Sequence, residues 1–325
     1  MRGTQLERSV VSLENVRKSY KGGFELGPVD LEVEPGHVVA VLGPNGAGKS
    51  TLFGMLMNLL PPDSGKMNLF GLSHPREEVA IKRRIGYVPE NALFHEDMSA
   101  EYLGGFVSHW YPNWDQQHYE DLLGRARIDP RKRFGKLSKG LQRRLQFALA
   151  LAVGPKLLLL DEPTTGVDLF ARQEMLGDIW RFARDSRDRE DAQKTVVFST
   201  QAVEEARQIA DQVAFFADGR FLGLHDKDSL LDGWKTLLVD GSPDENTPGL
   251  VGLESGIPTC VVSDSWRETA EALSAQGLRV IREEPVNLEQ ILSHLIREST
   301  EGRGASRRGS GRAGKLYPRS RPLSG

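Results

Sequence analysis

The residues best suited to chemistry lie at 43–50, which read Gly43-Pro44-Asn45-Gly46-Ala47-Gly48-Lys49-Ser50. Two glycines five positions apart, followed by lysine and serine, form the phosphate-loop pattern. Glycine allows positive φ and brings backbone N–H groups close to phosphate oxygens, and a helix that starts after the loop adds partial positive charge. We therefore expect residues 43–50, with the adjacent Thr51, to bind the phosphates of a nucleotide.

The last two residues of this pattern have side chains suited to a triphosphate. The Lys49 ammonium supplies a mobile positive charge for the β- and γ-phosphates. The Ser50 hydroxyl can join a Mg²⁺ shell, because Mg²⁺ prefers hard oxygen ligands and keeps several waters. The loop follows a β-branched run at 38–42 and precedes a helix-like segment, as the pattern requires. The sequence thus predicts ATP and Mg²⁺ as ligands.

Two carboxylates form a second candidate group directly after a run of four leucines at 157–160. Such a run predicts a strand buried on both faces, as in a parallel sheet. Ionised carboxylates at the edge of a core need a cation or a water network. Asp161 is therefore the expected partner of the Mg²⁺ beside Ser50, and Glu162 the residue that polarises the attacking water.

The elements that must position these groups alternate along the chain. Strands are predicted at 37–42, 156–160 and 195–199, and a helix at 49–60, which indicates an α/β core with a largely parallel sheet. Beyond residue 225, the pattern of strand 259–263, helix 266–276 and strand 278–282 indicates a small α+β extension. One phosphate loop and no internal repeat exclude two tandem copies.

A third motif reveals a family resemblance. The sequence Leu137-Ser138-Lys139-Gly140-Leu141-Gln142 stands before Asp161 where ABC ATPases carry their signature. Residues 10–225 resemble that family because several of its motifs occur in the family's order: the phosphate loop, the signature, the Asp161-Glu162 pair, and residues 165–168, which look like the D-loop. A Ser hydroxyl and a Gly N–H at a helix start can bind a γ-phosphate. In the family two domains pack head to tail, so Ser138 and Gly140 would act on ATP held by a second subunit.

The resemblance implies an architecture and a role. It implies an ABC ATP-binding domain at 10–224, namely a P-loop NTPase core with a mostly parallel sheet, an antiparallel β subdomain and a helical subdomain at about 91–155. The extension would occupy 225–300. The implied activity is ATP hydrolysis that drives a separate integral membrane permease, on the cytoplasmic face of the cell membrane. Trp110, Tyr111 and Trp114 would either grip that permease or pack the subdomain together.

Two further positions match the family. Tyr20 stands where the family stacks an aromatic ring on adenine, although a half-buried strand tyrosine would look the same. Residues 85–90 resemble the Q-loop, with Glu90 where glutamine is usual. Either side chain offers an oxygen to Mg²⁺, and Glu90 adds a negative charge beside the metal.

The main departure from the family pattern is Gln201, where a switch histidine should follow Ser199-Thr200. Glutamine keeps a hydrogen-bond donor but cannot carry a proton, and such losses commonly cost about 10² to 10⁴ in rate. We expect slow hydrolysis, because Lys49, Asp161 and Glu162 are present. The alternative is a hydrolysis-impaired regulatory subunit paired with a second ATPase chain.

Composition narrows the remaining classes. No apolar run approaches the roughly 18 residues of a membrane span, and residues 1–14 lack the apolar block of a signal peptide. The single cysteine, Cys260, suits a reducing cytosol and excludes the cysteine-rich zinc modules of DNA-repair relatives. Fewer than a hundred residues separate the loop from the signature, which excludes the long coiled coil of chromosome-associated relatives. We expect no specific nucleic-acid partner.

The C-terminal part gives two weaker indications. Residues 287–292 resemble the terminal helix start of exporter-type subunits, which favours export over uptake without naming a substrate. From Arg303 onward there are seven Arg or Lys residues and no Asp or Glu, so residues 301–325 should form a basic disordered tail. That tail is either a solubilising segment or a contact with anionic lipid or nucleic acid.

Overall fold

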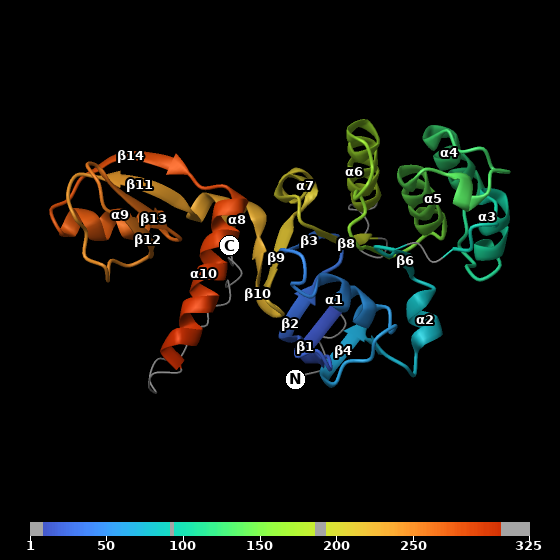
Figure 1. The fold of residues 1–325 in the computed structure, drawn as a ribbon, viewed down its shortest axis with the longest axis horizontal. Helices are drawn as coiled ribbons and strands as arrows, with labels where there is room; N and C mark the ends of the chain where they lie inside the picture. The colour runs from blue at the N-terminus through green and yellow to red at the C-terminus, as the bar shows by residue number, and fades with distance from the viewer. Residues whose placement is uncertain (1–8, 92–93, 186–192, 307–325) are drawn as a thin grey trace, which may run out of the picture.

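The computed structural model describes residues 9–91, 94–185 and 193–306, with side chains as far as residue 299. In this part of the chain, three sheets and their helices form an elongated body (Figure 1). The C-terminal extension lies at one end, the helices that follow β6 at the other, and the phosphate loop between them. None of the helices in the described ranges is long and apolar enough to cross a membrane.

The central sheet has six strands in the order β10-β9-β3-β8-β7-β6. Their bounds are β3 (Val38–Leu42), β6 (Ile85–Val88), β7 (Leu157–Leu160), β8 (Thr195–Thr200), β9 (Gln212–Ala217) and β10 (Arg220–Asp226). All neighbours are parallel except β9 and β10. The inner strands β3 and β7 are buried throughout, which explains their unbroken apolar sequences. The mostly parallel sheet expected from the sequence is therefore confirmed.

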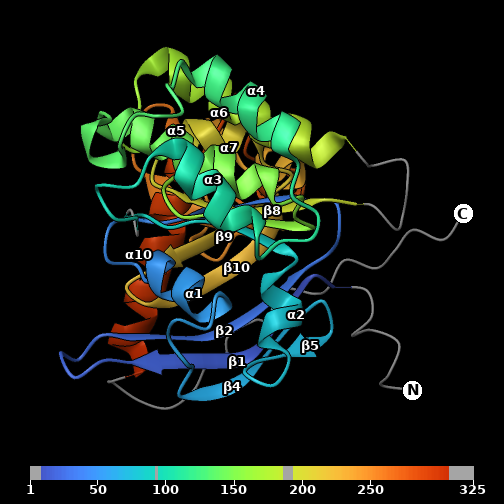
Figure 2. The same cartoon turned by 90° about the vertical axis from the view of Figure 1, so that its right-hand side faces the viewer.

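A second, antiparallel sheet packs below the first. It has the order β2-β1-β4-β5, with bounds β1 (Val11–Ser19), β2 (Glu25–Val33), β4 (Ser64–Leu69) and β5 (Leu72–Ser73). Helix α1 (Lys49–Leu56) fills the space between the sheets, where Leu52 and Phe53 are fully buried. Figure 2 shows this sheet on one side of α1 and β9 and β10 on the other. A short helix, α2 (Glu78–Lys82), leads into β6.

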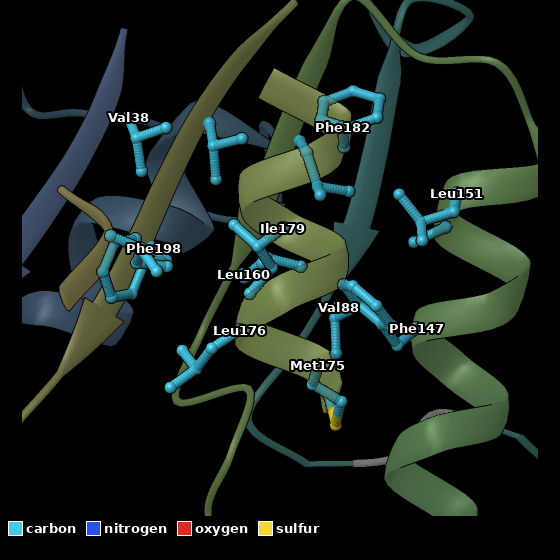
Figure 3. Packing of buried hydrophobic residues seen from close by; sticks show 14 of the residues in the cluster. Val38, Val88, Phe147, Leu151, Leu160, Met175, Leu176, Ile179, Phe182 and Phe198 are labelled. Carbon is cyan, nitrogen blue, oxygen red and sulfur yellow. The ribbon is translucent and has the colours of Figure 1, made fainter. Parts of the chain in front are cut away.

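Between β6 and β7 the described residues form helices and their connecting loops, with one isolated β-bridge between Ser99 and Arg133. The helices are α3 (Ala100–Ser108), α4 (Gln116–Ala126), the 3₁₀ turn η1 (Phe134–Lys136) and α5 (Lys139–Ala152). Helix α6 (Leu169–Arg184) follows β7, and α7 (Val203–Ile209) follows β8. Figure 3 shows α6 presenting Met175 and Ile179 to the sheet residues Val88 and Leu160, with Phe147 of α5 alongside. One apolar cluster thus joins these helices to the sheet that carries the phosphate loop.

The C-terminal extension is a four-stranded antiparallel sheet of order β12-β13-β11-β14 with three helices. Its elements are α8 (Lys227–Gly233), β11 (Lys235–Val239), β12 (Leu250–Glu254), β13 (Thr259–Ser263), α9 (Trp266–Ala275), β14 (Val280–Pro285) and α10 (Leu288–Ser306). Helix α10 returns to the main body, where Arg220 donates a 2.8 Å hydrogen bond to the Ser299 carbonyl. Trp234 and Ile291 belong to the main apolar cluster.

Three of the element boundaries expected from the sequence differ from the structure by two residues or more. The helix expected at 49–60 ends at Leu56, because Asn58 is left-handed (φ 51°) and the Leu59 N–H bonds the Gly54 carbonyl. The strand expected at 278–282 starts at Val280, because residues 277–278 close α9 in the same way. Helix α10 runs to Ser306 although the tail was expected from 301; residues 307–325 lie outside the described residues.

The aromatic residues between the Q-loop and the signature differ in how deeply they are buried. The Trp114 ring lies 5.0 Å from that of Tyr119, which is itself buried, so Trp114 packs the helices together. Tyr111 is half-buried. Trp110, two residues after α3, is 60% exposed, and Tyr102 and Phe106 on α3 are exposed as well. Packing therefore accounts for part of this set only.

Candidate active site

The phosphate loop connects the carboxyl end of β3 to the start of α1. Gly46 (φ 78°) and Gly48 (φ 101°) adopt the left-handed backbone that favours glycine. At Gly43, a Cβ atom would lie 2.2 Å from the Phe216 carbonyl oxygen, so only glycine fits beside β9. The loop is thus shaped by backbone requirements, and its N–H groups stay near the N-terminus of α1, where an anion is favoured.

A cavity of about 650 Å³ opens at this loop. It brings together residues from the ends of β3, β6, β7 and β8, because these parallel strands end at the same edge of the sheet, and residues from the turn after β1 in the antiparallel sheet. Its wall consists of Tyr20, Phe24, Pro44, Asn45, Gly46, Ala47, Gly48, Lys49, Ser50, Thr51, Glu90, Glu162 and Gln201. Most of the sequence-predicted site residues therefore surround one space of a size suited to a nucleotide.

A larger cavity of about 930 Å³ lies between α4 and α6, but its chemistry is less suited to an anion. Its cations are already paired, with Arg125 2.8 Å from Asp178 and Lys194 3.2 Å from Asp185. We therefore take the cavity at the phosphate loop as the candidate nucleotide site.

Lys49 is the buried cation of the phosphate loop. Its Nζ donates to the Gly43 carbonyl at 2.7 Å and to the Pro44 carbonyl at 3.3 Å. The same atom lies 3.3 Å from Oε1 of Glu162, and both side chains are less than a tenth exposed. The lysine charge is thus held by the loop itself and balanced by a carboxylate from β7.

The two carboxylates after β7 are buried and differ in their partners. Asp161 accepts a 2.6 Å hydrogen bond from the Ser199 hydroxyl, which in turn accepts the Glu162 N–H at 2.8 Å. Glu162 has a left-handed backbone (φ 48°), and its Oε2 accepts from Thr165 Oγ1 at 3.3 Å. Burial raises the pKa of both carboxyl groups; Ser199 opposes the rise at Asp161, and Lys49 opposes it at Glu162.

The residues predicted to hold a metal present hard oxygen atoms to one place. Ser50 Oγ donates to Glu90 Oε2 at 3.2 Å, and the Ser50 hydroxyl also lowers the pKa of Asp161 through a hydrogen bond. Among the described residues, no group of three or more Asp, Glu, His or Cys is arranged so that its side chains alone could hold a metal ion. One hydroxyl and two carboxylates fit Mg²⁺, which is usually bound by one or two carboxylates together with substrate phosphates.

Tyr20 lies at the opposite side of the cavity, just after β1. It is 39% exposed, and its hydroxyl lies 3.2 Å from Thr51 Oγ1. The Phe24 ring centroid is 6.0 Å away, and a tight Gly-containing turn joins the two residues through a 2.8 Å bond from the Tyr20 N–H to the Phe24 carbonyl. Sequence reasoning missed Phe24, although Gly22-Gly23 between two aromatics was a readable signal for such a turn.

Gln201 follows β8 directly, lies on the cavity wall and is exposed. Behind it, Glu205 of α7 is 3% exposed and accepts hydrogen bonds from Thr164 Oγ1 at 2.6 Å and Thr200 Oγ1 at 2.8 Å. The Nε of Arg172 lies 3.7 Å from the same carboxylate. Sequence reasoning missed this network, which joins the residue before Gln201 to the segment after Glu162.

Ser138 and Gly140 are not part of the described cavity wall. Ser138 is exposed at the N-cap of α5, where its Oγ accepts from the Leu141 N–H at 3.3 Å. A Cβ atom on Gly140 would lie 3.3 Å from the Gly166 carbonyl, so the signature approaches the 165–168 segment closely. One chain therefore brings the loop and carboxylates together but leaves the signature facing outward.

This combination of fold and cavity defines a P-loop nucleotide-binding protein. The sequence profile of the family described as ABC transporter matches residues 26–165. Nod factor export ATP-binding protein I of Rhizobium etli is 30% identical over 308 residues, which cover 90% of this chain and 95% of that protein. Daunorubicin resistance ATP-binding protein DrrA3 of Streptomyces coeruleorubidus is 34% identical, over 68% of this chain and 70% of that protein.

The fold is similar to solved ATP-binding cassettes as well. A dimeric structure of the cassette MJ0796 bound to ADP and Pi has a TM-score of 0.59 at 25% identity, covering 66% of this chain and 98% of that one. The structure of an ATP-binding subunit of an ABC transporter has a TM-score of 0.61 at 22% identity, covering 69% and 92%. The chain belongs to the ABC transporter family, as an ATP-binding subunit.

Proposed function

We propose that this chain binds ATP with Mg²⁺ in the cavity at the phosphate loop and hydrolyses the β–γ phosphoanhydride bond. The observation that carries this proposal is that Lys49 Nζ lies 3.3 Å from Glu162 at the edge of the parallel sheet, where the Lys49 charge also acts on the buried Asp161 carboxylate. Lys49 would bind the β- and γ-phosphates in exchange for its contacts with the loop carbonyls. Tyr20, on the same cavity wall, would stack on the base.

Glu162 is the residue we assign to the attacking water. It would accept the water proton as the water oxygen attacks the γ-phosphorus, and ADP would leave with the bridging oxygen. Burial raises the pKa of Glu162, which makes the carboxylate a better base. Ser50, Asp161 and Glu90 would hold Mg²⁺, which neutralises phosphate charge when bound.

Gln201 sets the expected rate. It lies on the cavity wall but cannot exchange a proton as histidine can, so we propose slow hydrolysis. The alternative, an ATP-binding regulatory subunit paired with a second ATPase chain, rests on the same residue. Both functions use the same binding cavity and differ only in turnover.

We also propose that two ATP-binding subunits, identical or different, close head to tail on two ATP molecules. In support, Ser138 is exposed at the N-terminus of α5, a position that favours an anion, and lies outside the cavity of its own chain. Ser138 and Gly140 would then bind the γ-phosphate held by the partner. The similar cassette MJ0796 is described as dimeric.

The work of the dimer would be export through a separate integral membrane permease. In support, one relative is named for Nod factor export and another for daunorubicin resistance. The protein would then lie on the cytoplasmic face of the membrane, bound to that permease. Copurification of a multi-span membrane protein with the tagged chain tests this part, and capture of soluble partners alone would contradict it.

The hydrolysis proposal is tested by ATPase assays on the purified protein with Mg²⁺. Glu162→Gln supplies the background and Gln201→His the test of the switch position. Activity that disappears in Glu162→Gln supports a working ATPase. Intact ATP binding without activity above that background, together with activity in Gln201→His, would favour the regulatory alternative.

A further inference from the structure

Arg143 is a buried cation of α5 that the proposed mechanism does not use. It is 6% exposed and lies five residues after Ser138, on the same helix. Burying a guanidinium is costly unless its donors are satisfied. Its partners therefore indicate what it stabilises.

The guanidinium group donates to two successive main-chain carbonyls. One nitrogen donates to the Pro89 carbonyl, and the other donates to the Glu90 carbonyl at 2.7 Å. These carbonyls follow β6 directly, in the segment that leads to the Glu90 carboxylate. A rigid fork of donors matches two adjacent acceptors, which the single ammonium of lysine cannot do in the same way.

The segment held by Arg143 reaches the predicted metal site. The Glu90 carboxylate accepts from Ser50 Oγ at 3.2 Å, so a continuous path runs from α5 through Arg143 and Glu90 to the phosphate loop. Burial lowers the pKa of Arg143, and the carboxylates of Asp161, Glu90 and Glu162 oppose that shift. Arg143 thus also lies within the electrostatic field of the site acids.

We propose that Arg143 is a positioning residue that holds the Glu90 carboxylate beside Ser50 and so ties Mg²⁺ binding to the position of α5. The inference rests on the proposed binding of Mg²⁺ with ATP. Because Ser138 begins the same helix, any displacement of α5 on contact with a second subunit would be carried through Arg143 to Glu90. The helix that contacts one nucleotide thereby adjusts the metal ligands of another.

The test compares two single variants with their double variant. Arg143→Lys keeps the charge but loses the fork, and Glu90→Ala removes the carboxylate. Each single variant should reduce by about tenfold the factor by which Mg²⁺ tightens ATP binding, since a hydrogen-bonded ligand position is lost. The double variant should lose no more than either single variant, because both changes act on the same carboxylate.

The measurement is equilibrium titration of the full chain with a fluorescent ATP analogue, in Mg²⁺ and in EDTA. Arg144→Lys is the matched control, because Arg144 is the next residue of α5 and pairs with Glu174 at 2.6 Å instead. That variant should bind as the wild type does. Thermal unfolding of each variant shows whether the fold is retained.

Three results would overturn the inference. Losses that multiply in the double variant would mean that Arg143 does not act through Glu90. An equal loss of affinity in Mg²⁺ and in EDTA would mean that Arg143 only supports the fold. An unchanged Mg²⁺ effect in Arg143→Lys would mean that the fork is not needed. Because the titration measures binding, an inactive wild type would refute proposed hydrolysis and leave this comparison intact.

Discussion

Replacing Tyr20 by alanine should weaken ATP binding about 30-fold. The residue is 39% exposed at the cavity wall. A tyrosine buries roughly 200 Å² when fully covered, so roughly 80 Å² of Tyr20 remains for a base to cover. At about 25 cal/mol per Å², that area corresponds to about 2 kcal/mol, within the range of about 1 to 3 kcal/mol for stacking on aromatics. About 2 kcal/mol is about 30-fold in Kd.

The assay is equilibrium titration with ATP and with GTP, because stacking tolerates different bases and both affinities should fall together. Tyr20→Phe keeps the ring and loses only the 3.2 Å contact with Thr51, so its Kd should change about threefold or less. Tyr102→Ala is the control for removing an exposed ring, since Tyr102 is 57% exposed on α3, away from the cavity wall.

The stacking argument fails if Tyr20→Ala binds ATP within about twofold of the wild type. In that case Tyr20 would be the half-buried tyrosine that the sequence equally allowed. A loss in Tyr20→Phe as large as in Tyr20→Ala would instead assign the effect to the hydroxyl and Thr51.

Three further predictions concern buried polar groups. Burial raises the pKa of Asp161 above its usual value, so the nucleotide-free protein loses stability as pH rises through the pKa of the folded state. Asp161→Asn should therefore raise Tm at pH 7 and raise it much less near pH 4. An equal gain in Tm at both pH values would contradict this account. Glu205→Ala should lower the free energy of unfolding in urea by about 2 to 4 kcal/mol, because the buried Thr164 and Thr200 hydroxyls lose their acceptor. The control Glu204→Ala, at an exposed residue, should change it by less than about 0.5 kcal/mol. Equal effects would show that the two hydroxyls find other partners. Tyr119→Phe removes a buried 2.7 Å bond to the Ala100 carbonyl and should cost about 1 kcal/mol by the same measurement, so an unchanged midpoint would mean that the bond contributes nothing net.

The phosphate loop and the acids after β7 were predictable because their signals are local. Gly46 and Gly48 need positive φ, and the four leucines of β7 need burial on both faces, so residue type reports the structure directly. The parallel order of the strands then brings both groups to one edge. That edge could be expected from the alternation of strands and helices alone.

The buried charges could not be predicted in this way. Glu204 and Glu205 are neighbours of identical type, and only the packing of α7 makes one exposed and the other a buried acceptor. On α5, Arg143 is buried and donates to main-chain carbonyls, whereas the next residue, Arg144, is half-buried and pairs with Glu174. The end of α1 at Leu56 was also missed. It depends on Asn58 adopting a left-handed backbone, which asparagine can adopt but does not require, so the residue type alone does not mark the helix end.

The C-terminal extension packs against the body that carries the candidate active site, and helix α10 takes part in this contact. Trp234 and Ile291 are buried in the main apolar cluster, and the Arg220 guanidinium holds the Ser299 carbonyl from 79 residues away. A chain cut after β10 would expose the apolar surface that the extension now covers, and Arg220 would lose its acceptor, the Ser299 carbonyl. The extension therefore shares its apolar core with the ATP-binding domain. Transferring the extension to a homologue would also require transferring the apolar surface of that domain that packs against Trp234 and Ile291.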